Sequence, residues 1–125
     1  MAKSGRGHCS YIPEYFSAGF RPELLQQASA LVGMHPDEAT EAIVDAALAN
    51  RKPFAVVPCC VFPTLFPGRT LADGSAVVHT QQFALYLASK DRRIRIRRLP
   101  FEGRNLVVYA DSLGSAEDKT PLQAT

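Results

Sequence analysis

The chain has 125 residues, enough for one domain with one modest core. Its composition, 46% hydrophobic and 21% charged, is that of an ordinary globular protein and excludes wholesale disorder. A net charge of +2 is too small to argue for nucleic-acid binding by itself, and no apolar run approaches the roughly 20 residues of a membrane span, so we expect no membrane partner.

The first 22 residues are expected to form an irregular leader, because glycines and a proline interrupt them and their aromatic residues follow no period. Basic residues near Met1 precede no apolar stretch, so they do not indicate a secretory signal. A helical turn is expected over residues 21–27. A strand is predicted over residues 28–34; it is apolar on both faces, which is typical of a strand covered from both sides in a parallel sheet.

An amphipathic helix is predicted to begin at Pro36 and Asp37 and to run to Ala49. Asp37 suits the N-cap or the first turn, Asn50 can accept a left-handed C-terminal cap, and Pro53 prevents continuation. Residues 54–57, FAVV, read as a second doubly buried strand. Strand, helix and strand in this order predict a right-handed βαβ unit with parallel strands.

A loop rich in proline and glycine follows, and a second helix is expected over about residues 77–90, burying Phe83, Tyr86 and Leu87. Residues 94–96 and 106–109 read as two strands of an antiparallel hairpin joined by residues 100–103. The predicted fold class is therefore α/β, with a domain over residues 23–112 and a loose polar tail over residues 113–125.

Polar and titratable residues occupy the two places where parallel strands are expected to end. In open α/β sheets, ligands bind outside the carboxyl ends of the strands, here Met34–Asp37 and Pro58–Cys60. Asp37 can act in proton transfer, although helix capping is sufficient to explain it. For His35, a general base or substrate-binding group and a side chain bonded to nearby backbone remain equally open.

The adjacent cysteines Cys59 and Cys60 do not favour a disulfide, because neighbouring residues rarely bridge. We expect a reducing compartment, the cytoplasm, with these thiols packed as small hydrophobic side chains. A thiol nucleophile with His35 as its base is an alternative. A metal site is not expected, because pairs of ligands spaced C-x₂₋₄-C are missing.

The run from Arg92 to Arg98 is the main basic feature, and its alternation predicts one face carrying Arg93, Arg95 and Arg97. These side chains suit phosphate contacts with nucleic acid. They also suit an edge strand that resists pairing with other chains. We favour the edge strand, because no stacking aromatic residues alternate with the arginines.

The string from Leu31 to Phe62, LVGMHPDEATEAIVDAAL…KPFAVVPCCVF, resembles the later half of class I S-adenosylmethionine-dependent methyltransferase domains. The branch it resembles has a histidine-then-acid turn after the fourth strand and a Pro-Cys-Cys turn after the fifth, and includes tRNA-methyltransferase-like proteins. The resemblance covers residues 25–110, since the next helix and the Arg-rich hairpin are similar to the family's last helix and its sixth and seventh strands. It implies a partial Rossmann-like methyltransferase sheet with the Arg-rich strand at its edge.

The resemblance also implies site residues and a cofactor. His35, Pro36 and Asp37 would flank the reacting centre. The acceptor pocket would take in these residues: Met34, Pro36, Pro58, Cys59, Cys60 and Phe62. The cofactor would be S-adenosylmethionine. Residues 1–28 do not have the sequence pattern of the family's first strand, glycine-rich loop and helix, so the residues that would bind this cofactor are unassigned.

Three functions follow as hypotheses. The first is a methyltransferase-like fragment, inactive alone, whose missing N-terminal half or partner protein covers the uncovered edge of the sheet. The second is a protein-binding module that docks through that edge. The third and weakest is a small thiol enzyme that uses Cys59 or Cys60 with His35.

Overall fold

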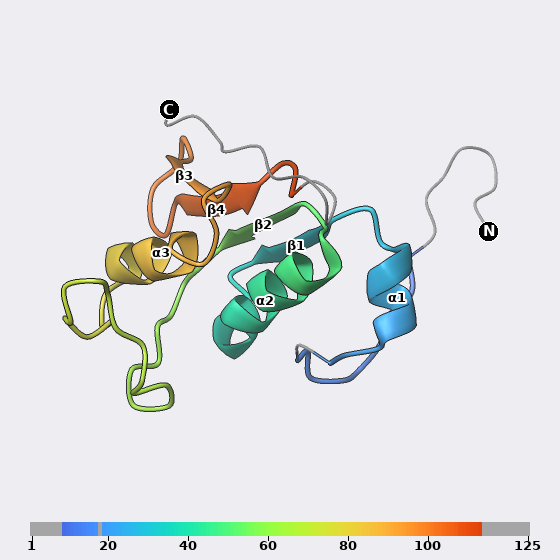
Figure 1. Cartoon of the computed structure of the whole chain (residues 1–125), viewed down its shortest axis with the longest axis horizontal. Helices are drawn as coiled ribbons and strands as arrows, with labels where there is room; N and C mark the ends of the chain where they lie inside the picture. The colour runs from blue at the N-terminus through green and yellow to red at the C-terminus, as the bar shows by residue number, and fades with distance from the viewer. Residues whose placement is uncertain (1–8, 18, 114–125) are drawn as a thin grey trace.

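The computed structural model describes residues 9–17 and 19–113 and has four strands and three α-helices in that part of the chain. Figure 1 shows their arrangement. In chain order the elements are α1 (Pro22–Gln27), β1 (Leu31–Met34), a 3₁₀ turn (Asp37–Ala39), α2 (Thr40–Asn50), β2 (Phe54–Val57), α3 (Thr80–Ala88), β3 (Arg95–Arg98) and β4 (Leu106–Ala110).

The strands form one mixed sheet in the order β1-β2-β4-β3. β1 and β2 are parallel, with Leu31 beside Phe54 and Met34 beside Val57, whereas β4 is antiparallel to both β2 and β3. The α/β class, the parallel strand–helix–strand unit and the antiparallel hairpin are therefore confirmed. The Arg-rich β3 is at one edge of the sheet, as expected, and β1 is at the other.

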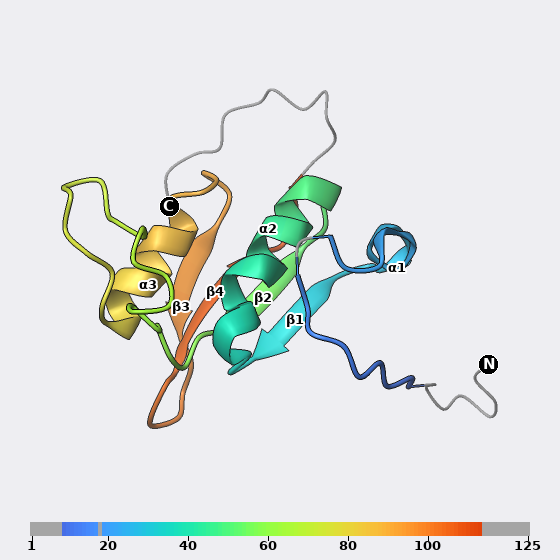
Figure 2. The ribbon, with the colours of Figure 1, turned by 90° about the horizontal axis from the view of Figure 1, so that it is seen from below.

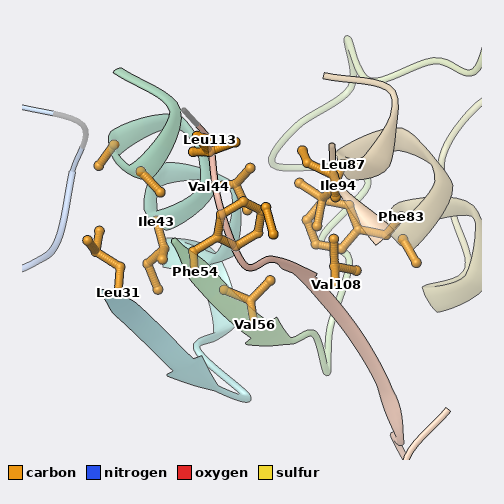
Figure 3. Close-up of a cluster of buried hydrophobic side chains, with 14 of the residues drawn as sticks. Leu31, Ile43, Val44, Phe54, Val56, Phe83, Leu87, Ile94, Val108 and Leu113 are labelled. Carbon is orange, nitrogen blue, oxygen red and sulfur yellow. The ribbon is translucent and has the colours of Figure 1, made fainter. Parts of the chain in front are cut away.

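One face of the sheet packs against two helices. Figures 1 and 2 show α2 beside β1 and β2, and α3 beside β3 and β4. Figure 3 shows the resulting core, in which Val56 and Val108 of the central strands belong to the same cluster as Val44 of α2 and Leu87 of α3. These four side chains are completely buried, and they join both helices to the sheet through a single hydrophobic core.

The opposite face of the sheet is open at β1, so the prediction that this strand is covered on both sides was wrong. In β1, Leu31 is buried whereas Val32 is 76% exposed and Met34 is 61% exposed. In β2, by contrast, Phe54, Val56 and Val57 are buried and Ala55 is half-buried, as predicted. Ala55, Val107 and Tyr109 belong to the same open face as Val32, since alternate residues of a strand point to opposite faces. An apolar sequence pattern indicates only that side chains favour burial, and among the described residues no element covers Val32 and Met34.

Several boundaries differ from those predicted. β1 begins at Leu31 rather than residue 28, because Ala28 ends α1 by donating its backbone N–H to Leu24. α3 begins at Thr80 rather than near residue 77, since the Gln82 side chain accepts the backbone N–H groups of Val78 and His79 and so fixes the start.

Two terminal features also differ. Asn50 stays helical and donates its side chain to the Ala46 carbonyl, so Arg51 takes the left-handed position at φ 54°. Leu113, placed in the predicted tail, is 3% exposed and belongs to the core. The rest of that tail and leader residues 1–8 and 18 lie outside the described residues.

No helix within residues 9–17 and 19–113 combines the length and the apolar character needed to cross a bilayer.

Candidate functional site

The turn after β1 has an unusual backbone. His35 and Asp37, on either side of Pro36, have positive φ angles of 49° and 54°, in the left-handed region that non-glycine residues seldom adopt. The turn is held in place by the parallel ladder, in which the His35 backbone N–H donates to Val57 at 2.9 Å. Conformations of this kind cluster at functional sites, which makes this turn a candidate.

Gly33 allows the turn to pack closely under α2. A Cβ added at Gly33 would meet Ile43 Cδ1 at 2.8 Å and Pro36 Cγ at 3.1 Å. A side chain at this position would therefore displace both the helix contact and the turn that carries His35 and Asp37.

The turns after β1 and β2 meet through one side-chain hydrogen bond. The Cys59 thiol donates to Asp37 Oδ1 at 3.0 Å. Asp37 is thus a first-turn acid but not the predicted helix cap, since the 3₁₀ turn has no side-chain cap and the Asp37 carboxylate is directed to the cysteine. Burial raises the pKa of the Cys59 thiol to about 11, and the hydrogen bond to Asp37 adds to this effect.

The hairpin loop between β3 and β4 joins the same group. Arg104 Nε donates to the Cys59 carbonyl at 2.9 Å, and the Arg104 carbonyl lies 3.4 Å from His35 Nε2, a long contact. His35 therefore contacts backbone, one of its two predicted roles. The two strand ends and the hairpin loop are linked at one end of the sheet.

A polar cavity of about 440 Å³ adjoins this end of the sheet. Cys59 and Cys60 line it together with His79 at the start of α3 and with Arg98 and Arg104 of the hairpin. The cysteine pair thus opens onto a cavity, whereas His35, Pro36 and Asp37 do not line it.

The other residues predicted for the acceptor pocket are not among those that line the cavity. Met34 lies on the open face of the sheet, and Pro58 is completely buried. Phe62 is half-buried, with a left-handed φ of 54°, in the loop that follows.

The cysteines are not the packed hydrophobic side chains that we expected. All three in the chain are free; Cys60 and Cys9 are exposed, and Cys59 is half-buried. A nucleophilic thiol needs a lowered pKa and a nearby base, but Cys59 has a raised pKa and bonds to Asp37 rather than to His35. This geometry argues against the thiol-enzyme hypothesis.

Sequence reasoning missed a partly buried ionic network that fixes the loop after the cysteines. Arg69 is 6% exposed, bonds to Glu41 at 2.7 Å and donates to the Val61 carbonyl at 3.0 Å. Tyr86 and Lys90 bond to the other oxygen of Glu41, at 2.6 Å and 2.7 Å. The partners of Glu41 are 28, 45 and 49 positions away, so no local spacing reveals them.

The guanidinium of Arg69 is also held by aromatic rings. Its Cζ lies 3.9 Å from the centre of the Phe66 ring and 4.5 Å from that of Phe83. Cation–π contacts of this kind stabilise a desolvated guanidinium. Arg69 therefore connects the cysteine loop to both α2 and α3.

The arginine run is divided by the structure. Arg95 and Arg97 pair with Tyr109 and Val107 and share the open face. Arg93 precedes β3 and forms an ion pair with Asp91 at 3.9 Å, so it is not part of the strand face to which it was assigned.

No protein-family model, curated protein or solved structure matches this chain. Its function is therefore argued from the geometry of the described residues.

Proposed function

We propose that the chain provides the acceptor side of an S-adenosylmethionine-dependent methyl-transfer site, as a methyltransferase-like half domain in the cytoplasm. The observation that carries the proposal is the meeting of the turns after two parallel strands, where the Cys59 thiol and the Asp37 carboxylate are 3.0 Å apart. The order strand, helix, strand, helix and hairpin is the one that the resemblance implies, and a partial Rossmann-like sheet is part of the proposal.

In this proposal the methyl acceptor enters the cavity beside the cysteine pair. The walls formed by His79, Arg104 and Asn105 suit a polar acceptor that forms hydrogen bonds. Asp37 acts as a positioning residue, because its carboxylate holds the Cys59 side chain at the edge of the cavity. Arg104 fixes the same segment through the Cys59 carbonyl.

The described residues do not fit S-adenosylmethionine itself. A nucleotide cradle needs glycines at which a ligand can approach the backbone after a strand. Gly33, at the end of β1, is filled instead by Ile43 and Pro36. The cofactor side must then come from another polypeptide segment, and we derive no chemical step through the cofactor.

The open sheet face is where we propose that this segment docks. A groove of about 560 Å³ is lined by Val32, Ala55, Val107 and Tyr109, and exposed apolar patches of this kind mark interaction sites. Parallel strands are ordinarily covered on both faces, so helices of the cofactor side suit this surface. Arg97 lines the groove, which favours a partner with acidic groups at that border.

The same face favours a second candidate, a protein-binding module without methyl transfer. The exposure of Val32 and Met34 supports it as directly as it supports the half domain. Nucleic-acid binding through the arginine run is not favoured, because Arg98 bonds to Asn105 and Arg93 to Asp91.

Deletion of the gene followed by mass spectrometry of methylated nucleosides and amino acids tests the proposal. We expect one methylated species to disappear and the wild-type chain to restore it. Asp37→Asn should restore it poorly, whereas Asp73→Asn, in an exposed loop away from the cavity, should restore it fully. An unchanged methylation profile in the deletion strain would reject methyl transfer and leave the binding module.

A further inference from the structure

Three side chains with metal-binding atoms converge where β1 and β2 end. A carboxylate oxygen of Asp37 and the sulfurs of Cys59 and Cys60 all lie within 4.8 Å of one another. The two closest atoms, Cys59 Sγ and Asp37 Oδ1, are 3.0 Å apart. Adjacent residues of a strand point to opposite faces, but the chain leaves β2 at Val57, so both sulfurs reach the same carboxylate.

The separations suit a single tetrahedral ion. Zinc binds thiolate sulfur at about 2.3 Å and carboxylate oxygen at about 2.1 Å, which places neighbouring ligand atoms about 3.6 to 3.8 Å apart. The three atoms of this group already lie close to that range, so small side-chain rotations are sufficient. Two sulfurs and one oxygen select a borderline-soft cation over Mg²⁺ or Ca²⁺, which prefer oxygen ligands alone.

The backbone that carries the cysteines is fixed on both sides. The Cys59 carbonyl accepts Arg104 Nε at 2.9 Å, and the Val61 carbonyl accepts Arg69 Nη1 at 3.0 Å. Asp37 is fixed by its own turn, in which Thr40 Oγ1 donates to its carbonyl at 2.8 Å. Supporting bonds of this kind keep ligands in the geometry that a metal needs.

We propose that Asp37, Cys59 and Cys60 bind one thiophilic divalent cation, with Zn²⁺ the metal that suits them best. Binding breaks the two S–H bonds, releases both protons to solvent and forms two metal–thiolate bonds. The two thiolates and the carboxylate leave a net charge of −1 on the bound site, which the nearby Arg104 guanidinium offsets. Cys59 and Cys60 line the cavity, so the fourth coordination position is open to water or to a ligand there.

Titration of the reduced full-length chain with Co²⁺ under anaerobic conditions tests the proposal. We expect a near-ultraviolet thiolate-to-cobalt band and the visible bands of a tetrahedral ion at one equivalent, both displaced by Zn²⁺. Cys59→Ser and Cys60→Ser should each lower the thiolate band by about half. Asp37→Asn should keep the thiolate band but weaken the affinity by about tenfold or more.

Cys9→Ser is the matched control, because Cys9 is the remaining cysteine and lies outside the group. It should bind Co²⁺ as the wild type does. Zn²⁺ should also raise the Tm of the wild type and of Cys9→Ser, and should raise that of Cys60→Ser by less, since this variant retains one thiolate ligand and its exposed side chain should not be needed for folding. No thiolate band in the wild type, or a band lowered in Cys9→Ser and undiminished in Cys60→Ser, would overturn the proposal. Neither measurement involves methyl transfer, so the result is independent of the proposed function.

Discussion

Glu41→Gln is expected to destabilise the chain strongly, because it removes the central acid of the partly buried network around Arg69. The Glu41 side chain is 18% exposed and receives bonds from Arg69, Tyr86 and Lys90. Burial opposes ionisation of Glu41, but bonds from Lys90, Tyr86 and Arg69 outweigh it and hold its pKa below the ordinary value. Neutralising the side chain leaves the Arg69 guanidinium buried without its counter-charge.

The expected loss follows from what the partners retain. Removing one member of a buried ion pair costs about 3 to 5 kcal/mol. Arg69 keeps the Val61 carbonyl and two aromatic rings, and Lys90 keeps Asp45 at 3.0 Å. We therefore expect Glu41→Gln to lower the free energy of unfolding by about 2 to 4 kcal/mol, a large part of the roughly 5 to 15 kcal/mol of a typical domain.

Urea unfolding followed by far-ultraviolet circular dichroism measures this loss. Arg69→Met and the double variant complete a double-mutant cycle. The double variant should lose less free energy of unfolding than the sum of the two single losses, by about 1 kcal/mol or more. Glu14→Gln is the control, because the Glu14–Arg21 pair is exposed and its loss should have a much smaller effect. A Glu41→Gln chain within about 0.5 kcal/mol of wild type, or additive losses in the cycle, would refute the reasoning.

Four further results are expected. The stability that ionised Glu41 contributes is complete above the unfolded-chain pKa of about 4.3 and is lost as the pH falls through the lower folded-state pKa. Below about pH 4 the free energy of unfolding should therefore fall less steeply with decreasing pH in Glu41→Gln than in the wild type. In the metal-free chain at pH 8, Cys59 should react with iodoacetamide about tenfold or more slowly than an ordinary exposed thiol, and peptide mass spectrometry with Cys9 as reference would disprove this by finding equal rates. Gly33→Ala should cost about 1 to 3 kcal/mol by overpacking against Ile43, whereas Gly68→Ala, with open space around its Cβ, should not; equal urea midpoints would contradict the packing. Val56→Ala should cost about 2 to 3 kcal/mol and Val32→Ala less than about 0.5 kcal/mol, and a comparable loss for Val32 would mean that its face of the sheet is covered.

The local elements could be predicted because their signals are local. Alternation, helix caps and prolines lie within a few residues of the boundaries they determine. The predicted strand over residues 54–57 is therefore the strand that forms, and the predicted boundaries of β1 and β3 are correct to within three residues. The parallel pairing of β1 and β2 follows from chain order alone. The shared end of the two strands, and with it the proximity of Asp37 and Cys59, was predictable on this basis.

The features that could not be predicted depend on residues far apart in the sequence or on which face of the sheet is left exposed. The apolar pattern of Val32 and Met34 gives no sign that their face of the sheet is open. Arg69 reads as a loop cation in sequence, although its aromatic and acidic partners bury it. Arg104 donates a hydrogen bond to the Cys59 carbonyl, 45 positions away in the sequence. Every residue has a backbone carbonyl, so the pattern of side chains does not indicate which one accepts this bond.

Calorimetric titration of the isolated chain with S-adenosylmethionine tests the half-domain proposal most directly. The residues after β1 fill the space around Gly33 and provide no nucleotide cradle, so we predict no heat of binding up to millimolar cofactor, while a complete class I methyltransferase domain titrated in parallel does bind. A micromolar Kd for the isolated chain would contradict the claim that the cofactor side is supplied by another segment.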